Sequence, residues 1–113
     1  MVGNPNILPM QRTIVIAGQG IRLANAIAEF KQWIEANMFP FATTKLAIDI
    51  LPGHPLNRGM VGVRGNYKIP DNTEVVIAIG TSLSVMTVGY KRELLPENAN
   101  IQIIDYLKEY LNV

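Results

Sequence analysis

Two glycines after an apolar run are the residues of this chain best suited to binding an anion. Residues 13–17 read Thr-Ile-Val-Ile-Ala, and Gly18, Gln19 and Gly20 follow directly. A glycine turn between a buried strand and a helix can point backbone N–H groups at a phosphate, which the helix dipole favours. The dinucleotide fingerprint needs a third glycine, and Leu23 stands in its place. The alternative is a tight turn that only requires glycine torsions.

A second glycine-rich segment could also surround a phosphate. Residues 59–65 contain three glycines; Arg58 precedes them and Arg64 lies among them. Successive backbone N–H groups in such a loop can form an anion-binding concavity. The same loop could instead pack over the edge of a sheet, and the sequence leaves both interpretations open.

Polar residues at the ends of other apolar runs complete the candidate ligand site. Asp105 ends the run 101–105 and could accept a hydrogen bond from a ribose hydroxyl, or it could cap a following helix. Thr43 and Thr44 end the second expected strand, where an ordinary NAD site has an acidic residue. We therefore do not expect an orthodox NAD site.

The sequence contains no set of residues typical of a catalytic centre. His54 is the only histidine and lies between Gly53 and Pro55, so we expect a solvated turn histidine. Ser82 and Ser84 lack the G-x-S-x-G context of a serine nucleophile. The absence of cysteine excludes disulfides and thiolate metal sites. Without a second histidine or a close carboxylate pair, no metal site is expected.

The elements that would position these residues alternate between strands and helices. The apolar run 13–17 lacks alternation, which indicates a strand buried on both faces of a parallel sheet. We expect a helix over 21–37 with its apolar stripe on the sheet. The stripe consists of Leu23, Ile27, Phe30 and Ile34. The remaining expected elements are a strand at 39–43, a short helix at 45–49, a loop at 52–66, a strand at 75–80, a loop at 81–89, a strand at 101–105 and a helix at 106–112.

This order predicts an α/β fold, a three-layer sandwich with a mainly parallel sheet. Residues 1–11 are an expected lead-in, and 12–113 form one expected domain. Of the 113 residues, 49% are hydrophobic and 17% are charged, which indicates a well-buried core. The net charge is +1 without a basic stripe, so nucleic acid is not an expected partner. No apolar run is long enough for a membrane span, and we expect a cytoplasmic protein.

Several short motifs, in this order and spacing, resemble a known family. They are Thr13 to Arg22, Phe39 to Thr44 with Asp49, Pro52, His54 and Pro55, Gly59 to Asn66, Ile79 to Ser84, and Ile103 to Asp105. Together they are similar to the central domain of thiamine-diphosphate-dependent enzymes, with the acetolactate synthase-like group as the nearest match. The resemblance spans roughly 12–105, which is most of the chain.

The resemblance implies a parallel six-stranded α/β domain related to the nucleotide folds of sirtuins and electron-transfer flavoproteins. Some members bind FAD or ADP, and many bind nothing and act as spacers between catalytic domains. Where a nucleotide is bound, the implied contacts map onto Gly18, Gly20, Arg22, Thr43, Thr44, Gly59, Met60, Gly62, Gly80, Thr81 and Asp105. Thiamine diphosphate and magnesium belong to other domains, which carry the catalytic glutamate and a Gly-Asp-Gly motif that this sequence lacks.

Three departures from the family pattern bear on function. Residues 67–72 are short and contain Pro70, Ser82 replaces a frequent arginine, and residues 106–109 replace an acidic continuation. These departures favour a non-catalytic structural domain, an excised or redesigned module that needs no cofactor. Its expected partners are catalytic domains of a parent enzyme, or copies of itself. The alternative is a nucleotide-binding module for FAD, ADP or NAD that uses the strand-end loops.

Overall fold

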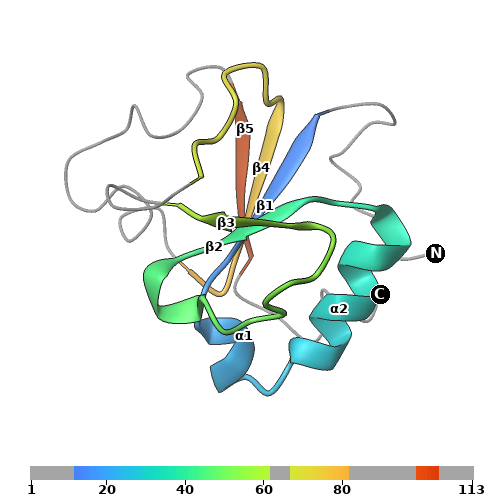
Figure 1. Cartoon of the computed structure of the whole chain (residues 1–113). Helices are drawn as coiled ribbons and strands as arrows, with labels where there is room; N and C mark the ends of the chain where they lie inside the picture. Colours follow the sequence, from blue (N-terminus) through green and yellow to red (C-terminus); the bar gives the residue numbers. More distant parts are fainter. Residues whose placement is uncertain (1–11, 62–66, 82–98, 105–113) are drawn as a thin grey trace.

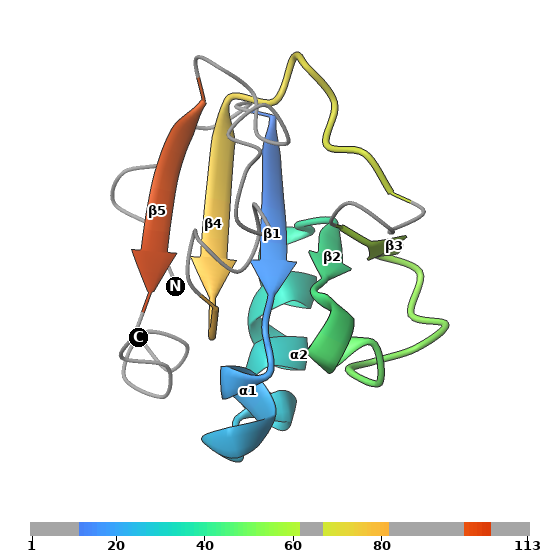
Figure 2. The same cartoon turned by 90° about the vertical axis from the view of Figure 1, so that its left-hand side faces the viewer.

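A computed structural model describes residues 12–61, 67–81 and 99–104. In these residues five strands form one sheet in the order β3-β2-β1-β4-β5, and every neighbouring pair is parallel. Figure 2 shows the arrowheads of β1, β2, β4 and β5 pointing the same way. The strands are β1 Thr13–Ala17, β2 Phe41–Thr43, β3 Asn57–Met60, β4 Val75–Ile79 and β5 Asn100–Ile104. The predicted α/β sandwich with a mainly parallel sheet is confirmed.

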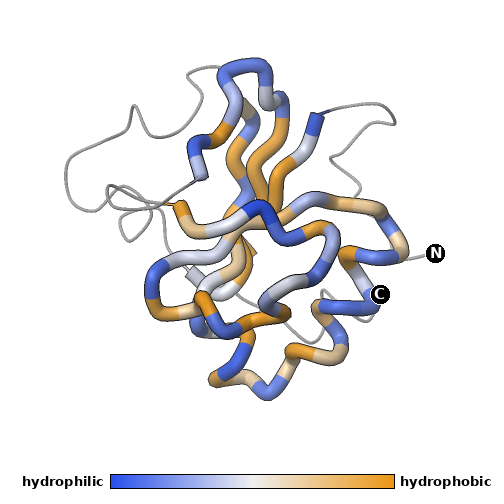
Figure 3. The backbone as a smooth tube through the Cα atoms, in the orientation of Figure 1, coloured by the Kyte–Doolittle hydropathy of each residue, from blue (hydrophilic) through white to orange (hydrophobic). Residues whose placement is uncertain are grey.

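The two central strands are buried on both faces. Every residue of β4 and all of β1 after Thr13 are buried, and both strands are apolar along the tube in Figure 3. Parallel pairing sets Ala17 opposite both Thr43 and Ile79. The last residues of β1, β2 and β4 therefore lie side by side, and the segments that follow them leave the same edge of the sheet.

One face of the sheet is covered by α2, which spans Ile27–Asn37 (Figure 1). Phe30, Trp33 and Ile34 are the buried residues of this helix. The ring of Phe30 meets that of Phe41 edge-on with centroids 5.3 Å apart, a preferred aromatic geometry. The opposite face buries Ile14, Ile16, Val76 and Ala78 in a second cluster that includes Val61 and Ile69.

The expected single helix over 21–37 is wrong, because the chain forms two. Helix α1 spans Gly20–Leu23, and α2 starts at Ile27. Between them Asn25 adopts a left-handed backbone with φ of +56°, which interrupts the helical hydrogen bonds and which asparagine tolerates better than most residues. Leu23, expected on the buried stripe, is consequently 75% exposed.

Helix α2 ends where Asn37 predicts, but β2 starts later than the expected residue 39. Met38 takes a left-handed conformation with φ of +55°, and the amide of Phe39 returns to the carbonyl of Ile34 at 3.0 Å. This hydrogen bond closes the helix end. Because Phe39 belongs to that turn and Pro40 has no N–H, the strand begins at Phe41.

The segment after β2 differs most from the sequence expectation. The short helix expected at 45–49 is a single 3-10 turn, η1, at Lys45–Ala47. The expected loop 52–66 contains the edge strand β3, which pairs with β2. One residue lies between Phe41 and Thr43, whereas two lie between their partners Asn57 and Met60, so β3 carries a bulge.

Strand β5 begins at Asn100, one residue before the expected 101. Some expectations concern residues outside the described ranges. They are the lead-in 1–11, the helix 106–112, the site residues Gly62 and Asp105, and the loop 81–89 beyond Thr81.

Candidate functional site

The candidate site lies at the carboxyl edge of the sheet, where open parallel sheets bind ligands. Most of the predicted contact residues end a strand or follow one directly, because the parallel strands finish at this edge (Figure 2). They are Gly18 and Gly20 after β1, Thr43 and Thr44 at β2, Gly59 and Met60 in β3, and Gly80 and Thr81 after β4. The structure thus brings eight of the predicted residues to one edge, with Arg22 in the adjoining α1.

The segments after β1 and β4 are in direct contact through their glycines. The amide of Gly18 donates to the carbonyl of Ile79 at 2.8 Å, and the amide of Gly20 donates to the carbonyl of Gly80 at 3.0 Å. A Cβ atom at position 18 would lie 2.3 Å from the Gly80 oxygen, and one at position 20 would lie 2.8 Å from the Gly80 Cα. Only glycine permits this approach. We call the contact of Gly18 and Gly20 with Gly80 the glycine junction.

The expectation that backbone N–H groups point outward here is wrong for Gly18 and Gly20. Both amides are bonded within the chain, and the amide of Ile21 bonds back to the Gly18 carbonyl at 3.2 Å. Helix α1 has only four residues, so its dipole is small. The amides of Gly18 and Gly20 are therefore satisfied within the chain, and a phosphate bound by either amide would have to displace the carbonyl of Ile79 or Gly80.

Arg22 is also engaged within the chain. Its guanidinium pairs with the carboxylate of Asp49 and donates to the carbonyl of Leu46 at 3.0 Å. These bonds hold α1 against the turn that contains η1, and the two elements lie side by side in Figures 1 and 2. A phosphate that used Arg22 would compete with Asp49, the carboxylate already bound.

The threonines of the site connect the end of β2 to the segments on either side of it. Thr43 and Thr44 are both buried. The amide of Thr44 donates to the carbonyl of Ala17 at 3.0 Å, and the carbonyl of Thr43 accepts from Val61 at 2.9 Å. The β2 end is thereby tied to β1 on one side and to the chain after β3 on the other.

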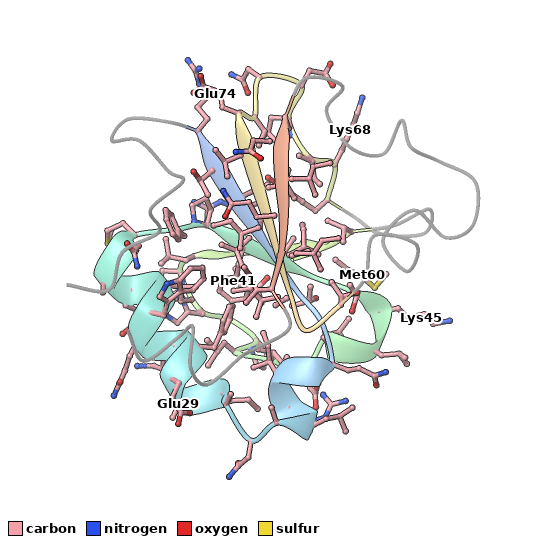
Figure 4. The ribbon with its side chains drawn as sticks, turned by 180° about the vertical axis from the view of Figure 1, so that it is seen from behind. Glu29, Phe41, Lys45, Met60, Lys68 and Glu74 are labelled. Carbon is pink, nitrogen blue, oxygen red and sulfur yellow. The ribbon has the colours of Figure 1, made fainter. Side chains whose placement is uncertain are left out.

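The bulge in β3 is stabilised by the side chain of Asn57. Its Oδ1 accepts from the amide of Gly59 at 2.8 Å, and its Nδ2 donates to the carbonyl of Leu51 at 3.2 Å. Gly59 has φ of +119°, a conformation that favours glycine. Figure 4 shows Met60 beyond this bulge, near Lys45 at the carboxyl edge of the sheet.

His54 is not the solvated turn residue that the sequence predicts. Its side chain is only 12% exposed, and its Nε2 lies 2.7 Å from Oε2 of Glu35 in α2. Its Nδ1 accepts from the amide of Leu56 at 3.0 Å. Sequence reasoning missed this contact because Glu35 is 19 residues away and no local pattern links the two.

Glu35 also pairs with a lysine on its own helix. Nζ of Lys31 lies 3.2 Å from Oε2 of Glu35. The hydrogen bond from His54 and then that from Lys31 hold the pKa of Glu35 below its ordinary value. The carboxylate therefore remains charged at mildly acidic pH. This network joins α2 to the segment that leads into β3.

Residues 12–61, 67–81 and 99–104 contain no group of three or more His, Asp or Glu side chains that could hold a metal ion. Within the same ranges, no helix has the length and apolar character needed to cross a membrane.

The sequence profile of the family described as "Thiamine pyrophosphate enzyme, central domain" matches residues 7–111. This chain belongs to that family. The match extends over the whole described sheet, and it confirms the resemblance carried by the glycine, proline and aspartate motifs. A thiamine pyrophosphate enzyme central domain is thus the architecture that presents the carboxyl edge described above.

Three similar proteins carry a related name. The chain is 32% identical over 99 residues to 3D-(3,5/4)-trihydroxycyclohexane-1,2-dione hydrolase 2 of Bacillus cereus. It is 31% identical over 99 residues both to hydrolase 1 of the same Bacillus cereus strain and to the hydrolase of Bacillus thuringiensis (strain Al Hakam). Each match covers 84% of this chain but only 15% of the relative. The central domain is therefore a small part of those proteins.

Two observations on the described residues bear on the cofactors associated with the family. A diphosphate with magnesium requires acidic and amide ligands, and the chain has no Gly-Asp-Gly sequence and no metal-ligand cluster in its described residues. A nucleotide phosphate at the first turn requires free amides, and those of Gly18 and Gly20 are bonded to the β4 end.

Proposed function

We propose that this thiamine pyrophosphate enzyme central domain is a non-catalytic structural module that holds neighbouring catalytic domains in place. The main support for this proposal is the hydrogen bond from the Gly20 amide to the Gly80 carbonyl at 3.0 Å. This hydrogen bond occupies an amide that a nucleotide-binding version of the fold would leave free for a phosphate. The ion pair of Arg22 with Asp49 supports the same conclusion.

The proposed partners are the catalytic domains of a parent enzyme. Three apolar side chains beside the Arg22–Asp49 pair support a contact there, because Leu23 is 75%, Leu46 59% and Ile48 58% exposed. Exposed apolar groups that lie together mark interaction surfaces more often than isolated ones do. By the names of its relatives, a protein containing this domain would hydrolyse a cyclic polyhydroxy dione. Thiamine pyrophosphate would be held by its other domains.

Calorimetric titration of the purified chain with FAD, ADP and NAD tests the proposal. We expect no saturable heat with any of the three from a protein that melts cooperatively. Saturable binding would contradict the proposal and favour a nucleotide module. Arg22→Ala is the matched variant for that outcome, because the side chain is exposed and its loss leaves the glycine junction intact. A substitution at Gly20 is unsuitable, since its Cβ would collide with the Gly80 backbone.

A further inference from the structure

The connection between η1 and β3 is held against α2 by one histidine side chain. Nδ1 of His54 accepts the Leu56 amide at 3.0 Å, so in this arrangement Nδ1 carries no proton. The neutral ring therefore carries its proton on Nε2, which donates to Glu35 at 2.7 Å. Both ring nitrogens are engaged, and the two hydrogen bonds together select one tautomer.

The backbone of Leu56 links this histidine to the sheet. The carbonyl of Leu56 accepts the amide of Phe41 at 2.9 Å, which is the first residue of β2. Directly afterwards Asn57 pairs with Phe41 and begins β3. A change at the Leu56 amide is therefore transmitted to the start of the β2–β3 pairing.

We propose that His54 is a pH-sensitive latch, and that protonation of its Nδ1 releases Leu56 and loosens the β2–β3 edge of the sheet. An imidazolium carries N–H groups on both nitrogens. Its Nδ1–H would then face the Leu56 N–H across 3.0 Å, two donors with no acceptor between them. Either the ring or the peptide must move away.

The charged groups around His54 do not cancel this effect. Glu35 on α2 would pair with the imidazolium, but its side chain is 42% exposed and it already bonds Lys31, so solvent and Lys31 weaken the gain. Arg58 on β3 donates to the Pro55 carbonyl at 2.9 Å, which adds positive charge to the same segment. The ring of Phe41, with its centroid 6.0 Å from that of His54 and its plane tilted by 57°, offers the imidazolium only a weak π contact.

Nuclear magnetic resonance of the full chain between pH 8 and pH 5.5 tests the latch. At pH 8 the imidazole nitrogen shifts should show the Nε2–H tautomer. As the ring protonates, the chemical shift of the Leu56 amide proton should move to the value of an amide without this hydrogen bond. The rate at which the Phe41 amide proton exchanges with solvent, corrected for the intrinsic effect of pH, should rise about tenfold, as expected for loss of one hydrogen bond. Amides of β1 and β4 serve as internal references and should stay unchanged.

Two variants separate the latch from general acid sensitivity. In His54→Asn the side-chain oxygen can accept the Leu56 amide at every pH, so the Leu56 and Phe41 signals should become independent of pH. In His54→Gln the longer amide can reach Glu35 but not the Leu56 amide, so the edge should be loose even at pH 8. The proposal is overturned by an Nδ1–H tautomer at pH 8. It is equally overturned if the Leu56 amide stays unchanged while the ring titrates, or if His54→Asn keeps the wild-type pH response.

This latch does not depend on the proposed scaffold role. It concerns the opening of one sheet edge in the isolated chain, whereas the scaffold role concerns ligands and neighbouring domains.

Discussion

At Gly18 two parts of the chain that are distant in sequence approach closely. A Cβ there would lie 2.3 Å from the Gly80 oxygen and 2.4 Å from the Cβ of Thr81, so neither neighbour can yield without a backbone shift. We expect Gly18→Ala to lower the free energy of unfolding by about 3 kcal/mol, at the upper end for overpacking. Chemical denaturation with urea measures this change.

Gly53→Ala is the matched control, because a Cβ at position 53 would meet nothing within 4 Å. Its φ of +77° still places an alanine in the left-handed region, which costs about 1 kcal/mol. If Gly18→Ala were no more destabilising than Gly53→Ala, the close approach at the glycine junction would not be the reason for glycine at position 18.

Glu35 gives the chain an acid-sensitive contribution to stability. Hydrogen bonds from His54 and Lys31 lower its pKa below 4.5, so the folded state binds its proton less readily than the unfolded state. The contribution is complete above pH 4.5 and disappears as pH falls through the lower folded value. We expect Glu35→Gln to melt at a lower temperature than the parent at pH 7 and at the same temperature near pH 2. A constant difference between the two proteins across that range would contradict this account.

Residue-level chemistry could be predicted from the sequence only where it depends on neighbours along the chain. The glycines after β1 and β4 could be identified because each directly follows a buried apolar run. Their contact with each other could not, because Gly18 and Gly80 meet only when β1 and β4 pair. For the same reason the sequence predicted free amides where the structure has bonded ones.

The residue that follows α2 has an unfavourable backbone conformation. Met38 has φ of +55° while its side chain is 71% exposed, so it gains little from burial. Replacing it with glycine removes about 1–2 kcal/mol of left-handed strain from the folded state. Glycine also gives the unfolded chain more conformational entropy, which lowers the free energy of unfolding by about 0.4–1 kcal/mol. We expect Met38→Gly to raise the free energy of unfolding by roughly 0.5–1 kcal/mol. Thermal denaturation measures it, and Met38→Ala, which keeps the strain, should not stabilise the chain.

Elements with a strong hydrophobic pattern could be predicted, and those formed by tertiary contacts could not. Strands β1 and β4 are continuous β-branched runs and were predicted at almost their observed bounds. Strand β3 reads Asn-Arg-Gly-Met, which has neither an apolar run nor an alternation, and it exists because β2 offers backbone partners. The break at Asn25 was missed because a single asparagine does not interrupt helical periodicity.

At the scale of the whole molecule, three exposed apolar side chains, Leu23, Leu46 and Ile48, lie on or directly after α1 and η1. If Leu23, Leu46 and Ile48 contact other domains in a parent enzyme, the chain alone exposes them to water. We expect concentration-dependent self-association by sedimentation velocity. The double variant Leu46→Lys, Ile48→Lys should sediment as a monomer, and Lys68→Glu, a substitution on another part of the chain, should behave like the parent. A parent chain that is monomeric at every concentration would remove this prediction.

We propose that the Gly80 carbonyl takes up the amide that a phosphate would need at the glycine junction, and the signal of the Gly20 amide reports on this hydrogen bond. Nuclear magnetic resonance of the labelled chain, recorded with increasing ADP, follows this one signal. We predict that the Gly20 amide exchanges slowly with solvent, because it bonds the Gly80 carbonyl, and that ADP leaves its shift unchanged. A Gly20 amide that exchanges rapidly, or that shifts saturably with ADP, would contradict this proposal and favour a nucleotide-binding domain.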